Sequence, residues 1–256
     1  MLIILSPAKS LDYETEFKCL DFSEIFFKKD VELLSSQLKK IKLSEIEKMM
    51  EVSPKLAELN FARFQNFSKK FDLKNARQAI LAFDGDVYEG IDKKNYSPKN
   101  FKFAQEHLLI LSGLYGILRP LDLIQPYRLE MGLDLRKSSL AKNLGVKNLY
   151  EFWGDKISDF LNSQKGETII NLASEEYFGS VNRKKINKKI INIFFKEKKN
   201  GALKIIGISS KKARGLMANF VVKNEIKNPQ ELKKFNLENY RFDAVLSDEE
   251  NYIFIR

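Results

Sequence analysis

The order of apolar and polar residues along the chain predicts a mixed α/β protein. Short apolar runs bounded by turn residues are typical of buried strands, because a helix usually needs about ten or more residues. Such runs are Leu2–Leu5, Ala79–Phe83, Leu108–Leu111 and Thr168–Leu172. The run Leu108–Leu111 is also compatible with the end of the helix expected before it, and we favour the strand.

Helical periodicity and capping residues predict helices between these runs. Apolar residues recur at helical spacing over Phe22–Ile41, Asn148–Leu161 and Lys211–Ile226. Three further helices are predicted from their first residues: a capping box formed by Ser44 and Glu47, and an N-cap serine followed by proline at Ser53 and at Ser97. The helix after Ser97 is expected to end near His107.

Two hairpins complete the predicted fold. Ile190–Phe195 is expected to pair with Ala202–Ile208 across the Lys199-Asn-Gly201 turn, and Tyr240–Leu246 with Tyr252–Ile255. We therefore expect a central mixed sheet with surrounding helices and a C-terminal β-hairpin. No repeat or linker is visible, so we expect a single domain over residues 1–256, with a near-neutral part (1–136) and a basic part (137–256) as its only subdivision.

Small or charged residues directly follow the apolar runs. In α/β proteins, functional sites are built where parallel strands end. If several of these strands are parallel, Lys9, Asp86, Glu175 and Lys211 converge on one rim of the sheet.

Positive charge is concentrated in the second half of the chain. The formal net charge is +10, and residues 1–136, 137–234 and 235–256 carry +1, +12 and −3. A basic surface of this kind fits a polyanion such as nucleic acid. Solvated lysines on helix faces are the plain alternative, because 35 of the 44 basic residues are lysine.

The numbers of cysteines and histidines exclude several kinds of functional site. With Cys19 and His107 as single representatives, an internal disulfide and a Cys/His metal cluster are excluded, as is peroxidase chemistry that needs two thiols. We expect no cofactor and no metal. The start of the chain lacks a secretory signal and no apolar run is long enough to span a bilayer, so we expect a cytoplasmic monomer without membrane contact.

Residues 103–136 contain no lysine but hold arginines, whose planar forks grip phosphate or carboxylate at two points. Gly113 and Gly116 suggest either a hairpin whose exposed amides meet a phosphodiester, followed by Arg119, or a turn that needs positive φ. The Tyr127 ring would suit stacking on a nucleic-acid base while the neighbouring Arg128 holds the phosphate backbone. Alternatively, Arg128 is ion-paired inside the fold with Glu130 or Asp122.

The segment from Ser209 predicts a helix start that suits a bound phosphate. Lys211, Lys212 and Arg214 would fall in the first helical turn, where the helix dipole already repels cations. An anion bound by the free amides and these side chains removes the conflict. The alternative is that the lysines extend into water.

Carboxylates also occur in the glycine-bearing loops. They are Asp84, Asp86, Glu89, Glu130, Glu175 and Glu176. They either hold Arg119 and Arg128 in place or act as general acids, bases or metal ligands of an enzyme, with Lys9 as a phosphate or Schiff-base partner. If the protein is an enzyme, we expect Lys9, Asp86, Glu130 and Glu176 in its centre. No spacing among them forms a recognised metal motif.

Several long blocks carry a resemblance to a known family. They are Met1–Asp12, Asn75–Gly90, Leu111–Gly132, Leu149–Gly154, Ile170–Tyr177 and Lys211–Met217. In their order and residues they resemble the bacterial YaaA family of peroxide-stress proteins, over almost the whole chain. The chain departs from the expected pattern at Ser10 and at Ala218-Asn219. The resemblance implies a cytosolic mixed α/β protein with a basic cleft, DNA binding and a part in limiting peroxide damage.

Together these observations predict a DNA-binding protein of the oxidative-stress response. It would contact duplex or distorted duplex DNA mainly through the backbone. The candidate phosphate ligands are Lys9, Gly113, Gly116, Arg119, Tyr127, Arg128, Lys211, Lys212 and Arg214. The alternative is an enzyme acting on nucleotides or damaged nucleic acid through the strand-end carboxylates and Lys9.

Overall fold

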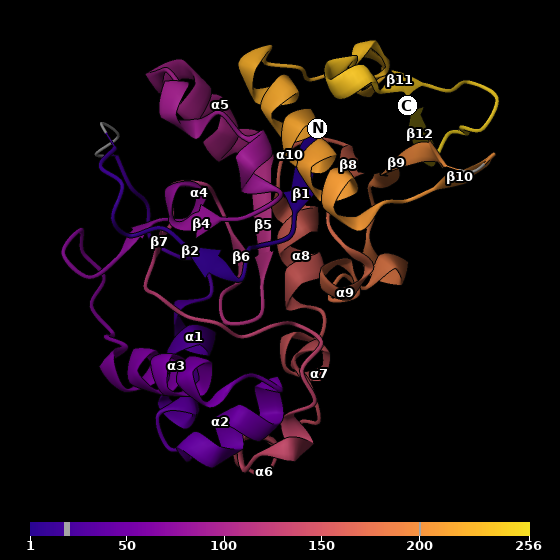
Figure 1. Cartoon of the computed structure of the whole chain (residues 1–256). Helices are drawn as coiled ribbons and strands as arrows, with labels where there is room; N and C mark the ends of the chain where they lie inside the picture. The colour runs from indigo at the N-terminus through magenta and orange to yellow at the C-terminus, as the bar shows by residue number, and fades with distance from the viewer. Residues whose placement is uncertain (18–20, 200) are drawn as a thin grey trace.

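A central eight-stranded sheet organises the molecule (Figure 1), which we describe from a computed structural model for residues 1–17, 21–199 and 201–256. Cys19 lies outside these described residues. The strands are β1 (Leu2–Leu5), β5 (Leu108–Ser112), β6 (Gly116–Leu118), β8 (Thr168–Asn171), β9 (Lys189–Lys199), β10 (Ala202–Lys204), β11 (Arg241–Phe242) and β12 (Asn251–Ile255). Their order is β11-β12-β9-β8-β1-β5-β6, with β10 paired to the end of β9.

The middle of this sheet is parallel. Strands β12, β9, β8, β1 and β5 run in the same direction, whereas β6, β10 and β11 are antiparallel additions. All four residues of β1 are buried, with Ile3 opposite Leu108 of β5 and Ile170 of β8. Such continuous apolar runs are expected of parallel strands covered on both faces. The fold class predicted from the sequence is confirmed.

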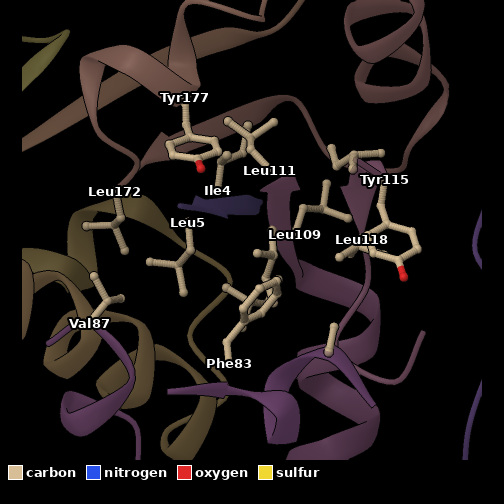
Figure 2. Packing of buried hydrophobic residues seen from close by; sticks show 14 of the residues in the cluster. Ile4, Leu5, Phe83, Val87, Leu109, Leu111, Tyr115, Leu118, Leu172 and Tyr177 are labelled. Carbon is tan, nitrogen blue, oxygen red and sulfur yellow. The ribbon is translucent and has the colours of Figure 1, made fainter. Parts of the chain in front are cut away.

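Buried side chains from distant parts of the chain meet around β1. Figure 2 shows Ile4 and Leu5 of β1 among Leu109, Phe83 and Tyr177, which come from three separate segments. Because both halves of the chain contribute to this core, the strand ends are held in fixed positions relative to one another.

Helices surround the sheet (Figure 1). They are α1 (Lys28–Leu38), α2 (Leu43–Met50), α3 (Pro54–Asn66), α4 (Ala79–Ala82), α5 (Pro98–His107), α6 (Leu140–Leu144), α7 (Leu149–Trp153), α8 (Lys156–Ser163), α9 (Glu175–Phe178) and α10 (Gly207–Lys223). Short 3₁₀ turns include η1 (Tyr88–Gly90), η4 (Arg183–Lys185), η5 (Pro229–Lys234) and η6 (Leu237–Asn239). None of the described helices is both long and apolar enough to cross a membrane.

Several local predictions are confirmed. Helices α3 and α5 begin at the proline after Ser53 and Ser97, and the Ser97 hydroxyl accepts a hydrogen bond from the backbone N–H of Asn100. Helix α5 ends at His107 and β5 follows at once, as favoured. The C-terminal hairpin forms, with Arg241 and Phe242 of β11 opposite Ile255 and Phe254 of β12. The partner predicted for Ile190–Phe195 is wrong: Ala202–Lys204 pairs with Glu197–Lys199 across the expected turn, whereas Ile190–Phe195 pairs with β8 and β12.

Other predictions are wrong. The run Ala79–Phe83 is a single turn of helix, α4, followed by β4 (Phe83–Asp84), which pairs with β2 (Ser10–Leu11) outside the central sheet. Its start is fixed by distant hydrogen bonds, including that from the Ala79 N–H to the Asp122 carbonyl (2.9 Å), that no local pattern reveals. Another small pair joins β3 (Arg77–Gln78) to β7 (Leu123–Ile124).

Two helix predictions also need correction. Helix α2 begins at Leu43, and Glu45 rather than Glu47 closes its start by accepting the N–H of Lys42 at 2.8 Å. The stretch Asn148–Leu161 is two helices, α7 and α8, because Gly154 between them has φ +49°. This positive φ, with ψ −124°, is a conformation that favours glycine and ends the first helix.

Helix α10 packs closely against η1, and a glycine permits the contact. A Cβ atom placed on Gly215 would lie 1.7 Å from the carbonyl oxygen of Val87, which is backbone and cannot move aside easily. This contact positions α10, with its arginine and lysines, beside the loop that carries Asp86.

Candidate functional site

The loops that follow β1 and β8 are tied together at the carboxyl edge of the sheet. The Ser6 hydroxyl accepts the backbone N–H of Ser174 (2.9 Å) and donates to the Ser174 hydroxyl (3.3 Å). Ser174 also caps α9, and the Tyr88 hydroxyl of η1 donates to the Ser6 carbonyl (3.0 Å). The predicted convergence of strand ends therefore holds for the loops that carry Lys9 and Glu175.

Lys9, Arg128 and Glu130 form one ionic cluster on this rim. Arg128 Nε and Nη2 each lie 2.9 Å from Glu130 Oε1, and Lys9 Nζ lies 3.4 Å from the same oxygen. The second oxygen, Oε2, is buried with no hydrogen-bond partner among the described residues. The Lys9 side chain is 65% exposed, whereas that of Glu130 is 10% exposed. A solvent-facing amine thus lies over a nearly buried carboxylate.

Tyr127 is buried, so it does not present its ring for stacking on a base. Its hydroxyl lies 2.6 Å from that of Ser112 at the end of β5, and its ring packs edge-on against Tyr115 at 5.1 Å. Burial, above all other causes, raises the pKa of Tyr127. The predicted stacking role of Tyr127 is therefore wrong, and the residue belongs to the core beneath the rim.

Arg119 is also paired within the fold. Its Nε and Nη2 donate to Asp122 Oδ1 at 3.1 and 2.9 Å, and its backbone N–H donates to Oδ2 at 2.8 Å. Burial raises the pKa of Asp122, and hydrogen bonds from Ser23 and Arg119 act in the opposite direction. Arg119 and Arg128 therefore both form ion pairs inside the fold, which was the alternative to their predicted role as phosphate ligands.

The Gly113–Gly116 turn joins β5 to β6 and is buried. Gly116 has φ +70°, so the explanation by positive φ holds for it. The Tyr115 N–H donates to Ser112 and the Gly113 carbonyl accepts the indole N–H of Trp153 at 3.0 Å. The turn does not display a row of exposed amides to a phosphodiester, because it is packed beneath Trp153.

The predicted phosphate site at the start of α10 is wrong in its register. The helix begins at Gly207, so Lys211, Lys212 and Arg214 lie beyond its first turn. Lys211 pairs with Asp86 (3.1 Å) and Lys212 with Glu238 (2.8 Å). The pairing with Asp86 does bring that carboxylate and α10 to the same edge.

Arg214 differs from the lysines before it. Among the described residues its guanidinium makes one long hydrogen bond, from Nη2 to the Ser210 hydroxyl (3.5 Å), and pairs with no carboxylate. Burial lowers the pKa of its guanidinium, and no carboxylate offsets this. Arg214 is thus a half-buried cation that faces a pocket.

Glu175 and Glu176 lie exposed on α9. Glu176 Oε1 accepts the backbone N–H of Gly132 at 3.1 Å, which ties α9 to the loop that follows Glu130. Glu176 therefore borders both the ionic cluster and the pocket.

The pocket has a volume of about 680 Å³ and lies where β8 ends, between α9, β9 and α10. Its lining includes Arg214, Arg183, Asn171, Asn192 and Asn251. Sequence reasoning did not identify the three asparagines as neighbours, because they meet only through the parallel pairing of β8, β9 and β12. Knowledge of that strand order would have revealed them.

The fold and this rim define a mixed α/β protein whose candidate site lies at the carboxyl ends of parallel strands. Residues 1–246 match the family model described as "Peroxide stress protein YaaA". The chain is 47% identical to UPF0246 proteins of Bordetella petrii and Saccharophagus degradans, and 46% identical to one of Acaryochloris marina. These matches cover the whole chain and 99 to 100% of each relative. The chain belongs to the YaaA family of peroxide-stress proteins.

Proposed function

We propose that this protein binds DNA through phosphate contacts and so limits peroxide damage to it in the cytoplasm. The observation that carries the proposal is the basic segment, which we define as residues 183–214. It contains twelve basic residues and one acidic residue, Glu197. Such a density of like charge disfavours the compact state unless an anion is bound.

Most of these cations lack an ion-pair partner. Within the described residues, Lys185, Lys189, Lys211 and Lys212 pair with carboxylates. The other eight do not: Arg183, Lys184, Lys188, Lys196, Lys198, Lys199, Lys204 and Arg214. They contrast with Arg119 and Arg128, whose charges are already neutralised inside the fold.

The shape of the segment also suits a duplex. Figure 1 shows the β9–β10 hairpin extending away from the helices. A two-stranded ribbon fits the major groove of B-DNA, and lysines along it reach the phosphates on either side. Lys198 and Lys199 are exposed near the hairpin turn.

Anisotropy of a labelled duplex tests the proposal. Affinity should fall steeply with salt, with a slope of about −0.9 in log K against log salt for each phosphate contacted. The same samples run on a gel should contain intact DNA if the role is protective. An affinity that does not change with salt would contradict a phosphate interface.

A second candidate function, an enzyme of nucleotide or nucleic-acid chemistry, is favoured by one observation. Glu130 Oε2 is buried without a partner beside the exposed Lys9 amine, an arrangement that suits proton transfer. Product formation on DNA or nucleotides that disappears in Lys9→Ala, with DNA affinity retained, would favour this function. Unchanged product formation in Lys9→Ala and Glu130→Gln would exclude this cluster as its centre.

A further inference from the structure

The pocket at the end of β8 contains a row of three asparagines. Asn171, Asn192 and Asn251 occupy the same register position on β8, β9 and β12. Asn171 Nδ2 donates to Asn192 Oδ1 (3.0 Å), and Asn192 Nδ2 donates to Asn251 Oδ1 (3.2 Å). In-register partners that bond side chain to side chain share one face of the sheet.

Further hydrogen bonds fix the orientation of this asparagine row. Asn171 Oδ1 accepts the N–H of Ala173, and Asn251 Nδ2 donates to Asp248. Each amide oxygen accepts one bond from within the row or its loop and retains a second lone pair, and Asn171 retains one N–H. The row therefore presents fixed acceptors and one donor to the pocket, as needed to bind the polar edge of a planar ring.

Two arginines supply positive charge to the same pocket. Arg214 enters from α10 and has no carboxylate partner among the described residues, while Arg183 lies with its guanidinium 4.9 Å from the centre of the Phe178 ring. A half-buried guanidinium without a counterion suits a phosphate, which it binds through two parallel hydrogen bonds.

The remaining lining of the pocket combines apolar and acidic side chains. Phe178, Phe194 and Ile205 offer flat or apolar surface. Glu175 and Glu176 lie on α9, and a phosphate is repelled from their side of the pocket and directed toward Arg214. The volume of about 680 Å³ lies within the usual range for small-molecule sites.

We propose that this pocket binds a single nucleotide, with its phosphate at Arg214 and its base edge at the asparagine row. A nucleotide is the ligand class that combines an anion, an apolar ring face and an amide-like edge. It comes either free from solution or extruded from a DNA strand. The second source rests on the proposed DNA binding.

The test uses the full-length protein and calorimetric titration with the four deoxynucleoside 5′-monophosphates, with deoxyribose 5-phosphate and with inorganic phosphate. In parallel, anisotropy compares a matched duplex with one that carries a single unpaired nucleotide. The variants are Arg214→Gln and Asn192→Ala, with Lys198→Ala as a control in the basic segment outside the pocket lining. Urea unfolding followed by Trp153 fluorescence verifies that each variant is folded.

A free-nucleotide site predicts that at least one monophosphate binds and that both pocket variants weaken it about tenfold or more, while Lys198→Ala does not. A strand-nucleotide site predicts preference for the unpaired duplex, lost in the same two variants. Nucleotide binding without duplex binding would support the pocket and contradict the proposed function. Two results would overturn the proposed nucleotide site. The first is that inorganic phosphate binds as tightly as the nucleotides. The second is that neither nucleotide affinity nor preference for the unpaired duplex is reduced by Arg214→Gln or Asn192→Ala.

Discussion

Arg128 and Glu130 are held together through one oxygen: Nε and Nη2 of the arginine both lie 2.9 Å from Oε1 of the carboxylate. This arrangement leaves Oε2 buried and without a hydrogen-bond partner in the part of the chain that the structure describes, and Lys9 completes the cluster from the solvent side. Arg128 is therefore engaged within the fold. Free positive charge for a polyanion lies instead in the basic segment, on the far side of β8.

The first prediction concerns the stability of this cluster. Arg128→Leu leaves the nearly buried Glu130 carboxylate without its two hydrogen bonds from the guanidinium and with the mostly exposed Lys9 amine as its remaining cation, so the free energy of unfolding should fall by about 3 kcal/mol. Lys9→Ala should change it by less than about 0.5 kcal/mol, because the lysine is mostly exposed. Urea unfolding monitored by the single tryptophan, Trp153, measures both. Equal effects of the two substitutions would contradict this account of the cluster.

A second prediction compares two glycines of α10. Gly215→Ala should destabilise the protein by about 1 to 3 kcal/mol or more, because the new methyl group meets the Val87 carbonyl. Gly207→Ala is the matched control: no atom lies within 4 Å of its added Cβ, so stability should stay the same or rise slightly. The melting temperatures of both variants, measured by thermal unfolding, test this difference. A neutral Gly215→Ala would show that α10 and η1 are not in contact as described.

A third prediction is a pH dependence of stability through His107. Burial is the main cause that lowers its pKa below 6.5, aided by the charge of the chain's amino terminus; a hydrogen bond with the Met1 carbonyl (2.9 Å) opposes the shift. The folded state therefore binds the proton less readily than the unfolded state. Stability should be fully present above about pH 6.5 and decline as the pH falls from there toward the folded-state pKa.

His107→Gln removes this titration. Urea unfolding of wild type and variant between about pH 8 and about pH 5 should show a steeper decline for the wild type below its unfolded-state pKa. Parallel curves over this range would contradict a lowered pKa for His107. Carboxylates that titrate below this range affect both proteins alike, so the difference isolates the imidazole.

The sequence predicts the elements whose signals are local. The serine and proline at Ser97 define the start of α5, and the apolar run Leu2–Leu5 defines β1, because capping and burial patterns lie within a few neighbouring residues. The run Ala79–Phe83 is equally apolar yet turns into helix, since its pairing partners are about forty residues away. Local pattern contains no information about such contacts.

The candidate site likewise contains residues that local sequence signals predict and residues that only distant contacts bring together. Lys9 and Asp86 were expected at strand ends. Lys9 follows β1 of the parallel sheet, whereas Asp86 follows β4, which is held near Lys9 by its pairing with β2. Glu130 joins them through its ion pair with Lys9. The asparagine row could not be predicted from the sequence, because the register of β9 against β12 depends on contacts throughout the sheet. The predicted start of α10 is too late in the chain, because its N-cap residue is Ile206, whose side chain cannot cap a helix and so gives no local signal.

The most direct test of the central claim is a comparison of two double charge reversals in duplex DNA binding. Lys198→Glu/Lys199→Glu lies in the basic segment, and Lys69→Glu/Lys70→Glu lies in the near-neutral half at two equally exposed lysines. Each variant replaces two cations with two anions, so both lower the formal net charge by 4, from +10 to +6.

The account predicts that the hairpin variant weakens binding about tenfold or more and reduces the salt slope by about 2, whereas the control stays close to wild type. Equal losses in both variants would mean that overall charge, not the basic segment, drives the interaction. Absence of duplex binding by the wild-type protein would contradict the proposed function itself.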